Sequence, residues 1–267
     1  MHVCFGLSPY GGLCMHVLLQ WVDVTIPGVA EVGGFSLCSA PHSLPFIELV
    51  VKRPLSGEYA PAQWFHTDQP EGAQVSVRAG GSFSYDPVRD AVLAHGGRRH
   101  LALVGGGIGI SPLRSIAHTC TRWVQTTEAG AASKLTVSVA YGASEPSELV
   151  FANDLLELQT RLPDRMHTRF TVAECPLAAP SPWAAAWDPV AASGRFDAPR
   201  LGVIDSAMVA ESLVPPRKAG TGADDSDSGE SNALVLVCGP PPMTDAVVEM
   251  CDQLGVPSAS VLFEKWW

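Results

Sequence analysis

The chain falls into two parts with different patterns of hydrophobic and polar residues. From Gln20 to about Tyr85, short β-like runs such as QWVDVTI, FIELVVKR and AQVSVRA are separated by clusters of Gly, Pro and Ser, which is typical of a small antiparallel sheet or barrel. From Leu101 onward, apolar runs such as MHTRFTV and ALVLVCG, predicted as strands, alternate with helical stretches, the signature of a parallel sheet built from βαβ units. We therefore predict an all-β plus α/β chain, with a barrel domain over residues 1–97 and a parallel-sheet domain over residues 98–267.

A stretch poor in apolar residues interrupts the second predicted domain. Its later part reads KAGTGADDSDSGES, and such a segment cannot bury enough apolar surface to order itself. We therefore expect a mobile insertion around residues 206–232. A functional acidic tail is the alternative interpretation of the same residues.

Composition narrows the classes of function. The net charge of −10 over 267 residues argues against a nucleic-acid partner, because such proteins display basic patches. The seven cysteines form no CxxC pair, which disfavours a metal site and a disulfide framework and fits a reducing compartment, either cytoplasm or mitochondrion. No apolar run approaches the ~20 residues of a spanning helix, so we expect no membrane span.

A run of glycines lies between a predicted strand and a predicted helix, in the stretch LVGGGIGISPLRS that begins at Leu103. Ser111 is expected to cap the helix with its hydroxyl, and Pro112 to occupy its first position. The free N–H groups at such a helix start attract an anion such as a pyrophosphate, and glycines let the ligand approach the backbone. On this window alone, a plain tight turn is the alternative.

A second strand-to-helix junction reads LVLVCGPPPMTDAVVEMCDQLG. The apolar run ends at Cys238, and a helix is predicted from near Met243 to Gly255. Four residues should form the buried face of this helix: Val247, Met250, Cys251 and Leu254. Because ligands of open α/β sheets bind at the carboxyl ends of strands, we expect Cys238 and Gly109 to border one crevice. A cysteine at a strand end is otherwise more often simply buried.

The motifs GGGIGISP and CGPPPM, in this order, resemble those of the ferredoxin-NADP reductase superfamily. The earlier GGFSLCSAP and the terminal FEKWW strengthen the likeness. The resemblance implies an N-terminal flavin-type antiparallel barrel followed by a nucleotide-binding domain of ferredoxin reductase type. It also implies hydride transfer from nicotinamide C4 to flavin N5, with NAD(H) or NADP(H) and FAD as cofactors. The final electron acceptor is not named by the sequence, and a protein is one candidate.

The resemblance also assigns site residues. The nicotinamide dinucleotide would be bound through Gly106, Gly107, Ile108, Gly109, Pro112, Cys238, Gly239, Pro240 and Met243. On the flavin side the assigned residues are Phe35, which would pack on the ring, Ser36, which would reach toward N5, Ser39, and Trp267 or its neighbour Trp266, which would shield the other face. The residues nearest the reacting atoms, and thus the catalytic candidates, are Ser36 and Cys238.

The chain departs from this family pattern at the flavin site. Gly33 replaces the arginine that usually neutralises the flavin pyrophosphate, and Tyr59–Ala60–Pro61–Ala62 replaces a Gly-x-x-Ser cradle. Each lost hydrogen bond to a charged group is worth roughly 1.5–3 kcal/mol, so we expect weak FAD binding. Only nineteen residues precede Gln20, so we expect an incomplete barrel unless HVCFGL or MHVLLQ supplies a strand.

The cofactor preference follows from charge after the second parallel strand. No basic residue lies between Tyr141 and Leu158, and Glu145 and Glu148 would repel a 2′-phosphate, which favours NAD(H) over NADP(H). The leading hypothesis is an NADH-dependent flavoprotein oxidoreductase. The alternatives are a nucleotide-binding sensor or assembly protein with a degenerate flavin site and no turnover, and an inactive fragment.

Overall fold

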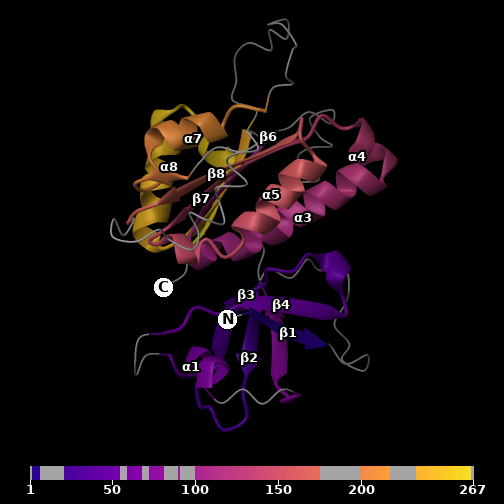
Figure 1. The fold of residues 1–267 in the computed structure, drawn as a ribbon, viewed down its shortest axis with the longest axis vertical. Helices are drawn as coiled ribbons and strands as arrows, with labels where there is room; N and C mark the ends of the chain where they lie inside the picture. Colours follow the sequence, from indigo (N-terminus) through magenta and orange to yellow (C-terminus); the bar gives the residue numbers. More distant parts are fainter. Residues whose placement is uncertain are drawn as a thin grey trace, which may run out of the picture.

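The computed structural model describes residues 2–6, 21–54, 59–67, 72–80, 90, 100–174, 199–216 and 233–265. These residues form two units, one of antiparallel strands and one built around a parallel sheet flanked by helices (Figure 1). The predicted fold class, all-β plus α/β, is confirmed. The predicted boundary between residues 97 and 98 lies outside the described residues.

The antiparallel unit contains two small sheets and one helix. Its elements are β1 (His2–Gly6), β2 (Trp21–Thr25), β3 (Gly33–Ser36), β4 (Phe46–Val50), α1 (Ala60–Thr67) and β5 (Ser76–Gly80). β2 lies between β3 and β5, and β1 pairs with β4. The segment HVCFG thus supplies a strand, as the sequence allowed, whereas MHVLLQ lies outside the described residues. Side chains alternate along β2, so Val22 and Val24 point into an apolar core with Leu49 and Phe65.

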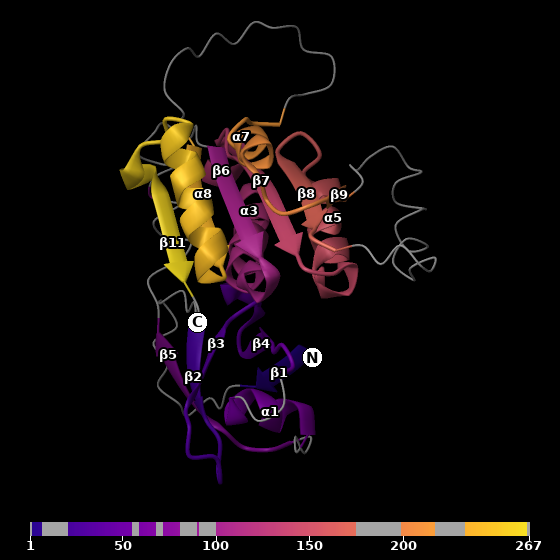
Figure 2. The same ribbon diagram turned by 90° about the vertical axis from the view of Figure 1, so that its left-hand side faces the viewer.

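The second unit is a six-stranded parallel sheet in the order β11-β10-β6-β7-β8-β9. The strands are β6 (His100–Gly106), β7 (Thr136–Ala143), β8 (Met166–Val172), β9 (Arg200–Leu201), β10 (Ala233–Gly239) and β11 (Val261–Lys265). The helices are α3 (Ile110–Thr126), α4 (Glu128–Ala132), α5 (Ala152–Arg161), α7 (Ser206–Ser212) and α8 (Pro241–Gln253). α3 and α5 cover one face of the sheet, and α7 and α8 cover the other (Figure 2).

The central strands are buried on both faces, which explains their unbroken apolar runs. Leu101 and Leu103 of β6 pack toward α3 and α5, while Ala102 and Val104 pack toward α7 and α8. On α3 the four apolar residues at the helical spacing i, i+3, i+4 and i+7 are all buried: Leu113, Ile116, Ala117 and Cys120. The described helices include none both long and apolar enough to cross a bilayer.

Two features of α8 differ from the prediction. α8 begins at Pro241 rather than near Met243, and Leu254 is exposed rather than part of its buried face. The helix ends as expected, since Gly255 has a φ of +75°, which favours glycine over other residues. The helix therefore starts closer to the sheet than the sequence indicated.

The predicted mobile insertion begins too early. Ser206–Ser212 forms α7, whose first turn is capped by Asp205 through a 2.8 Å hydrogen bond from the Met208 amide. Met208 and Val209 are buried against the sheet, so this segment has the apolar anchor that the acidic stretch lacks. The acidic residues of the prediction, 217–232, lie outside the described residues.

His100 at the start of β6 makes folding stability depend on pH. Its ring nitrogens lie 2.8 Å from Thr136 Oγ1 and 2.7 Å from the Ser212 carbonyl oxygen. Burial lowers the pKa of His100 from 6.5 to about 4, against the opposing effect of the Ser212 carbonyl. Between pH 6.5 and pH 4 the unfolded chain therefore binds a proton at His100 that the native protein does not. The free energy of unfolding is highest above the pKa of the unfolded state, and it falls as the pH falls toward the pKa of the native state.

We expect the free energy of unfolding to fall by up to about 3 kcal/mol between pH 6.5 and pH 4 because of this one residue. Urea denaturation across that range measures the effect. A His100→Gln variant keeps hydrogen-bonding capacity without titrating, so its stability should vary less with pH. An unchanged slope in the variant would assign the pH dependence to other groups.

Candidate nucleotide-binding site

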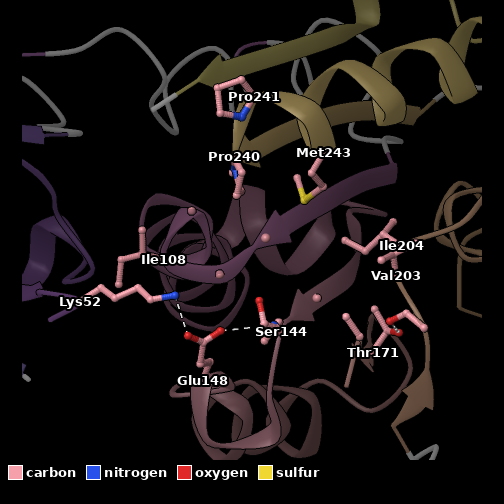
Figure 3. Close-up of a pocket in the computed structure, with 18 residues that line it drawn as sticks. Lys52, Ile108, Ser144, Glu148, Thr171, Val203, Ile204, Pro240, Pro241 and Met243 are labelled. Atoms are coloured by element: carbon pink, nitrogen blue, oxygen red, sulfur yellow. Dashed lines mark hydrogen bonds and ion pairs between the residues drawn. The ribbon is translucent and has the colours of Figure 1, made fainter. Parts of the chain in front are cut away.

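A cavity of about 370 Å³ opens at the carboxyl ends of β6, β7 and β10. Seven of the residues assigned from the sequence line it: Gly106, Gly107, Ile108, Gly109, Gly239, Pro240 and Met243 (Figure 3). β6 and β10 pair in parallel with Cys238 opposite Gly105, so the loops that follow the two strands leave the sheet side by side. The two motifs, which are far apart in the sequence, thus border one cavity.

Two of the loop glycines allow the two loops to pack closely against each other. A Cβ on Gly109 would meet the Cys238 carbonyl oxygen and would lie 2.6 Å from the Gly239 Cα. A Cβ on Gly106 would meet the Met243 sulfur and lie 3.3 Å from Pro240 Cδ. The protein's own backbone and side chains occupy the space over both positions. At Gly106 and Gly109 it is therefore another part of the protein, rather than the predicted ligand, that closely approaches the backbone.

Gly107 differs from its neighbours. It has a φ of +53°, and apart from its chain neighbours no atom of the described residues lies within 4 Å of where its Cβ would be. Because Gly107 also lines the cavity, the backbone here is open to a ligand. The glycine run thus combines packing at two positions with ligand access at a third.

The start of α3 corrects the predicted cap. The helix begins at Ile110 after a tight turn over Gly107–Gly109, and no side chain caps it. The Ser111 hydroxyl is buried without a hydrogen-bond partner, and Pro112, also buried, does not line the cavity. The Ile110 amide donates to the Gly107 and Ile108 carbonyl oxygens, and Pro112 has no N–H, so the start of the helix would attract a negatively charged ligand through its dipole.

The opposite wall of the cavity carries an ion pair that joins the two units. Lys52, two residues beyond β4, places its Nζ 2.6 Å from Oε1 of Glu148 (Figure 3). The other carboxylate oxygen accepts a 3.3 Å hydrogen bond from the Ser144 amide. The hydrogen bond from Lys52 lowers the pKa of Glu148, so this carboxylate is charged at neutral pH. Sequence analysis missed Lys52, because no linear pattern connects the barrel segment to this loop.

Cys238 supplies its main chain rather than its thiol to this region. The residue is fully buried, belongs to the apolar core on the α3 side of the sheet, and does not line the cavity. Its carbonyl faces Gly109. The structure therefore does not place the predicted catalytic side chain in the cavity.

Phe35, the residue assigned to pack on a flavin ring, lies in an aromatic cluster with Tyr59 and Phe65. Phe35 is 8% exposed and packs edge-on against Phe65 at a centroid distance of 5.3 Å. A Cβ at Gly33 would meet the Phe35 ring and would lie 2.7 Å from Pro61 Cβ. The Tyr59 hydroxyl accepts a 2.8 Å hydrogen bond from the Gly34 amide. These residues do not fit a flavin diphosphate, since position 33 has no room for a cationic side chain and the neighbouring amide is engaged.

The remaining assigned residues lie elsewhere. Ser36 ends β3, opposite Trp21 in register, and is half-buried. The Ser39 hydroxyl accepts a 3.0 Å hydrogen bond from the Glu48 amide, and Ser39 does not line the cavity. Trp267 lies outside the described residues. Within the described part of the chain, no group of three or more His, Cys, Asp or Glu side chains could hold a metal ion.

Comparisons with known proteins identify the fold and the family. The family description "Oxidoreductase NAD-binding domain" matches residues 103–187. Among solved structures, a cytochrome P450 reductase from Amycolatopsis superposes with a TM-score of 0.65 at 21% identity, over 93% of this chain and 60% of that one. A ferredoxin NADP+ reductase from Neisseria gonorrhoeae, solved with bound FAD and NADP, gives 0.62 at 15% identity, over 93% and 86%. These neighbours show the fold.

A curated relative shows the family. The Bos taurus protein named "Oxidoreductase NAD-binding domain-containing protein 1" is 33% identical over 256 residues, which cover 93% of this chain and 70% of the relative. The shared stretch includes both cavity-lining motifs, since it leaves out few residues of the chain. The chain belongs to the oxidoreductase NAD-binding domain-containing protein 1 family, on a ferredoxin reductase-type fold.

Proposed function

We propose that this chain binds a nicotinamide dinucleotide in the cavity and acts as an NADH-dependent oxidoreductase of the flavin reductase type. One observation carries the proposal. An uncapped 17-residue helix, α3, begins three residues after Gly107, whose Cβ position is open, at the carboxyl edge of a parallel sheet. This arrangement binds the diphosphate of a dinucleotide through backbone amides and the helix dipole.

The residues around the cavity suggest how the nucleotide would be oriented. With the diphosphate at Gly107 and the start of α3, the nicotinamide would lie toward Pro240 and Met243, which line the cavity from the second loop. Their apolar side chains would exclude water from the ring that gives up the hydride. The chain's contribution is binding and orientation, since hydride donation is a property of the nucleotide itself.

Glu148 supports the preference for NADH. It follows β7, the second strand of the domain in sequence, and lines the cavity. An acidic residue after the second strand hydrogen-bonds a ribose 2′-hydroxyl and repels a 2′-phosphate. Glu145, the other acidic residue of the prediction, does not line the cavity. We therefore propose Glu148 as the residue that favours NADH.

The electron acceptor is proposed from the neighbours. One neighbour was solved with bound FAD and another is a cytochrome P450 reductase, and a bound flavin would supply a hydride acceptor beside the nicotinamide. Because the described barrel residues do not fit a flavin diphosphate, we propose that any flavin exchanges freely rather than remaining bound through purification. The final acceptor is proposed to be a separate protein.

A second candidate function has its own observation in favour. Phe35 and Pro61 crowd the Cβ position of Gly33, and the Tyr59 hydroxyl engages the Gly34 amide, which is what a barrel without any flavin would contain. In that case the chain would bind the dinucleotide as a sensor or assembly partner without redox turnover.

One titration separates the two candidates. We expect purified protein to lack the absorbance of bound flavin near 450 nm, to bind NADH with a change in NADH fluorescence, and to oxidise NADH once FAD is added. NADH binding without oxidation at any FAD concentration would select the sensor. Absence of NADH binding would contradict both candidates. Heat-denatured protein provides the baseline for NADH oxidation by free FAD.

A further inference from the structure

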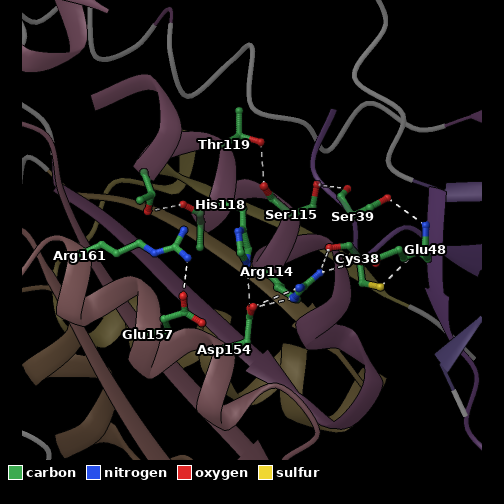
Figure 4. Close-up of polar contacts among 12 residues, drawn as sticks. Cys38, Ser39, Glu48, Arg114, Ser115, His118, Thr119, Asp154, Glu157 and Arg161 are labelled. Carbon is green, nitrogen blue, oxygen red and sulfur yellow. Dashed lines mark hydrogen bonds and ion pairs between the residues drawn. The ribbon is translucent and has the colours of Figure 1, made fainter. Parts of the chain in front are cut away.

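Arg114 lies where the two units meet. It stands in the second turn of α3, five residues after Gly109, and its side chain is only 13% exposed. Its Nη1 donates a 2.7 Å hydrogen bond to the Cys38 carbonyl oxygen and lies 3.4 Å from Oε2 of Glu48 (Figure 4). Cys38 and Glu48 belong to the antiparallel unit, so one side chain of the nucleotide unit binds two of its segments.

The guanidinium of Arg114 is held in place from its other side. Asp154 on α5 accepts a 2.8 Å hydrogen bond from Nε and a 3.1 Å hydrogen bond from Nη2. The guanidinium carbon lies 4.8 Å from the centroid of the Phe151 ring, and His118 Nε2 lies 2.8 Å from the same carboxylate. A bidentate pair with an aromatic platform fixes the plane of the guanidinium. Nη1 is thereby aimed at the Cys38 carbonyl.

The next residue of α3 makes a second contact with the same barrel segment. Ser115 Oγ donates a 2.8 Å hydrogen bond to the Ser39 carbonyl oxygen. The Cys38 side chain is fully buried in the apolar core of the nucleotide unit. Cys38 and Ser39 follow β3 directly after Leu37, and a backbone hydrogen bond of 3.0 Å from the Cys38 amide to the Glu48 carbonyl ties them to β4.

We propose that Arg114 is a positioning residue that fixes the segment Cys38–Ser39 of the barrel to the helix that begins at the nucleotide loop. The same helix carries the proposed diphosphate site at one end and this contact one turn later. Movement of the barrel strands β3 and β4 relative to the bound nucleotide is thereby restricted. The contact would hold the barrel in one position beside the nicotinamide, and so fix the approach of a hydride acceptor that binds transiently on the barrel side.

This role predicts a separation between binding and rate. Of the described residues that line the cavity, all but Lys52 belong to the nucleotide unit, so loosening the contact should leave NADH affinity nearly unchanged. Hydride transfer needs the reacting atoms roughly 3–3.5 Å apart, and a misplacement of ~1 Å costs ~100-fold in rate. The predicted loss of hydride-transfer rate rests on the proposed function, whereas the predicted coupling between the two units does not.

The test uses the full chain with Arg114→Met, which keeps side-chain bulk but removes every polar contact. Hydrogen–deuterium exchange of residues 37–40, NADH affinity, and NADH oxidation with added FAD and ferricyanide are compared with the unaltered protein. We expect exchange in residues 37–40 to rise at least ~10-fold, as expected when local stability falls by ~1.4 kcal/mol. NADH affinity should stay within about threefold and oxidation should fall ~10- to 100-fold.

Three further variants make the result decisive. Arg114→Lys retains the charge but not the bidentate geometry, so it should recover part of the rate. Ser115→Ala, which removes only the contact to Ser39, should raise exchange less than Arg114→Met does, and it remains informative if the latter does not fold. Arg161→Met removes an exposed ion pair with Glu157 elsewhere and should change nothing.

Two results would overturn the proposal. One is unchanged exchange of residues 37–40 in both Arg114→Met and Ser115→Ala. The other is a fall in NADH affinity that parallels a global loss of stability, which indicates an ordinary structural role. If the unaltered protein binds NADH but never oxidises it, the proposed function fails, and exchange and affinity still decide whether Arg114 couples the units.

Discussion

Replacing Gly109 with alanine should lower NADH affinity by about 10- to 100-fold and the free energy of unfolding by roughly 1–3 kcal/mol. The backbone of Gly109 has a φ of −63° and a ψ of −10°, which alanine adopts without strain. The effect must therefore come from the added methyl, which meets the Cys238 carbonyl and lies 2.6 Å from the Gly239 Cα. Both are main-chain groups of a central strand and its loop, so the glycine loop has to move away.

Urea denaturation and fluorescence titration with NADH measure the two quantities. Gly28→Ala is the matched control, because Gly28 lies in the barrel with a φ of +83° and open space around it. It should cost about 1 kcal/mol of stability through backbone strain and leave NADH affinity unchanged. If Gly109→Ala behaves like this control, the contact between the two loops is not required for the site.

Replacing Glu148 with glutamine should raise NADPH affinity about 10-fold while NADH affinity stays within about threefold. The substitution removes a charged carboxylate from the cavity wall and releases the Lys52 ammonium, now 2.6 Å away, to pair with a phosphate. Both changes favour a 2′-phosphate, and neither alters the glycine loop that would hold the diphosphate. Parallel titrations with NADH and NADPH give the ratio of affinities.

Glu145→Gln separates local charge from net charge. Glu145 lies three residues from Glu148 but does not line the cavity, so its removal changes the protein's net charge equally with little effect at the site. We expect less than a threefold change in the affinity ratio. An equal gain in both variants would mean that long-range charge, rather than the Lys52–Glu148 pair, sets the preference.

The strands that are covered on both faces of the sheet could be predicted from the sequence. β8 and β10 match the predicted runs MHTRFTV and ALVLVCG residue for residue, because strands covered on both faces need unbroken apolar sequence. The helix α1 was not predicted, since its residues were taken as a substitute for a phosphate cradle. Its Pro61 stands in the first turn, where proline is compatible with a helix, and its buried face is too short for a periodic signal.

The candidate site could be predicted as far as the main chain determines it. Both loop motifs were found because glycine and proline mark backbone geometry. The Ser111 cap was wrong because the turn over Gly107–Gly109 already directs the chain into the helix at Ile110. Lys52 and Arg114 were missed, since each acts across the two units and a basic residue on a helix or after a strand is ordinarily solvated.

The pairing of β6 with β10 also bears on when the site forms. These two strands lie side by side in the sheet although β7, β8 and β9 come between them in the sequence. Contacts between such distant segments form slowly, because a long loop of chain must close first. During synthesis the glycine loop emerges before β10 and Met243. Nascent chains that end before Met243 are therefore expected to have no complete nucleotide pocket.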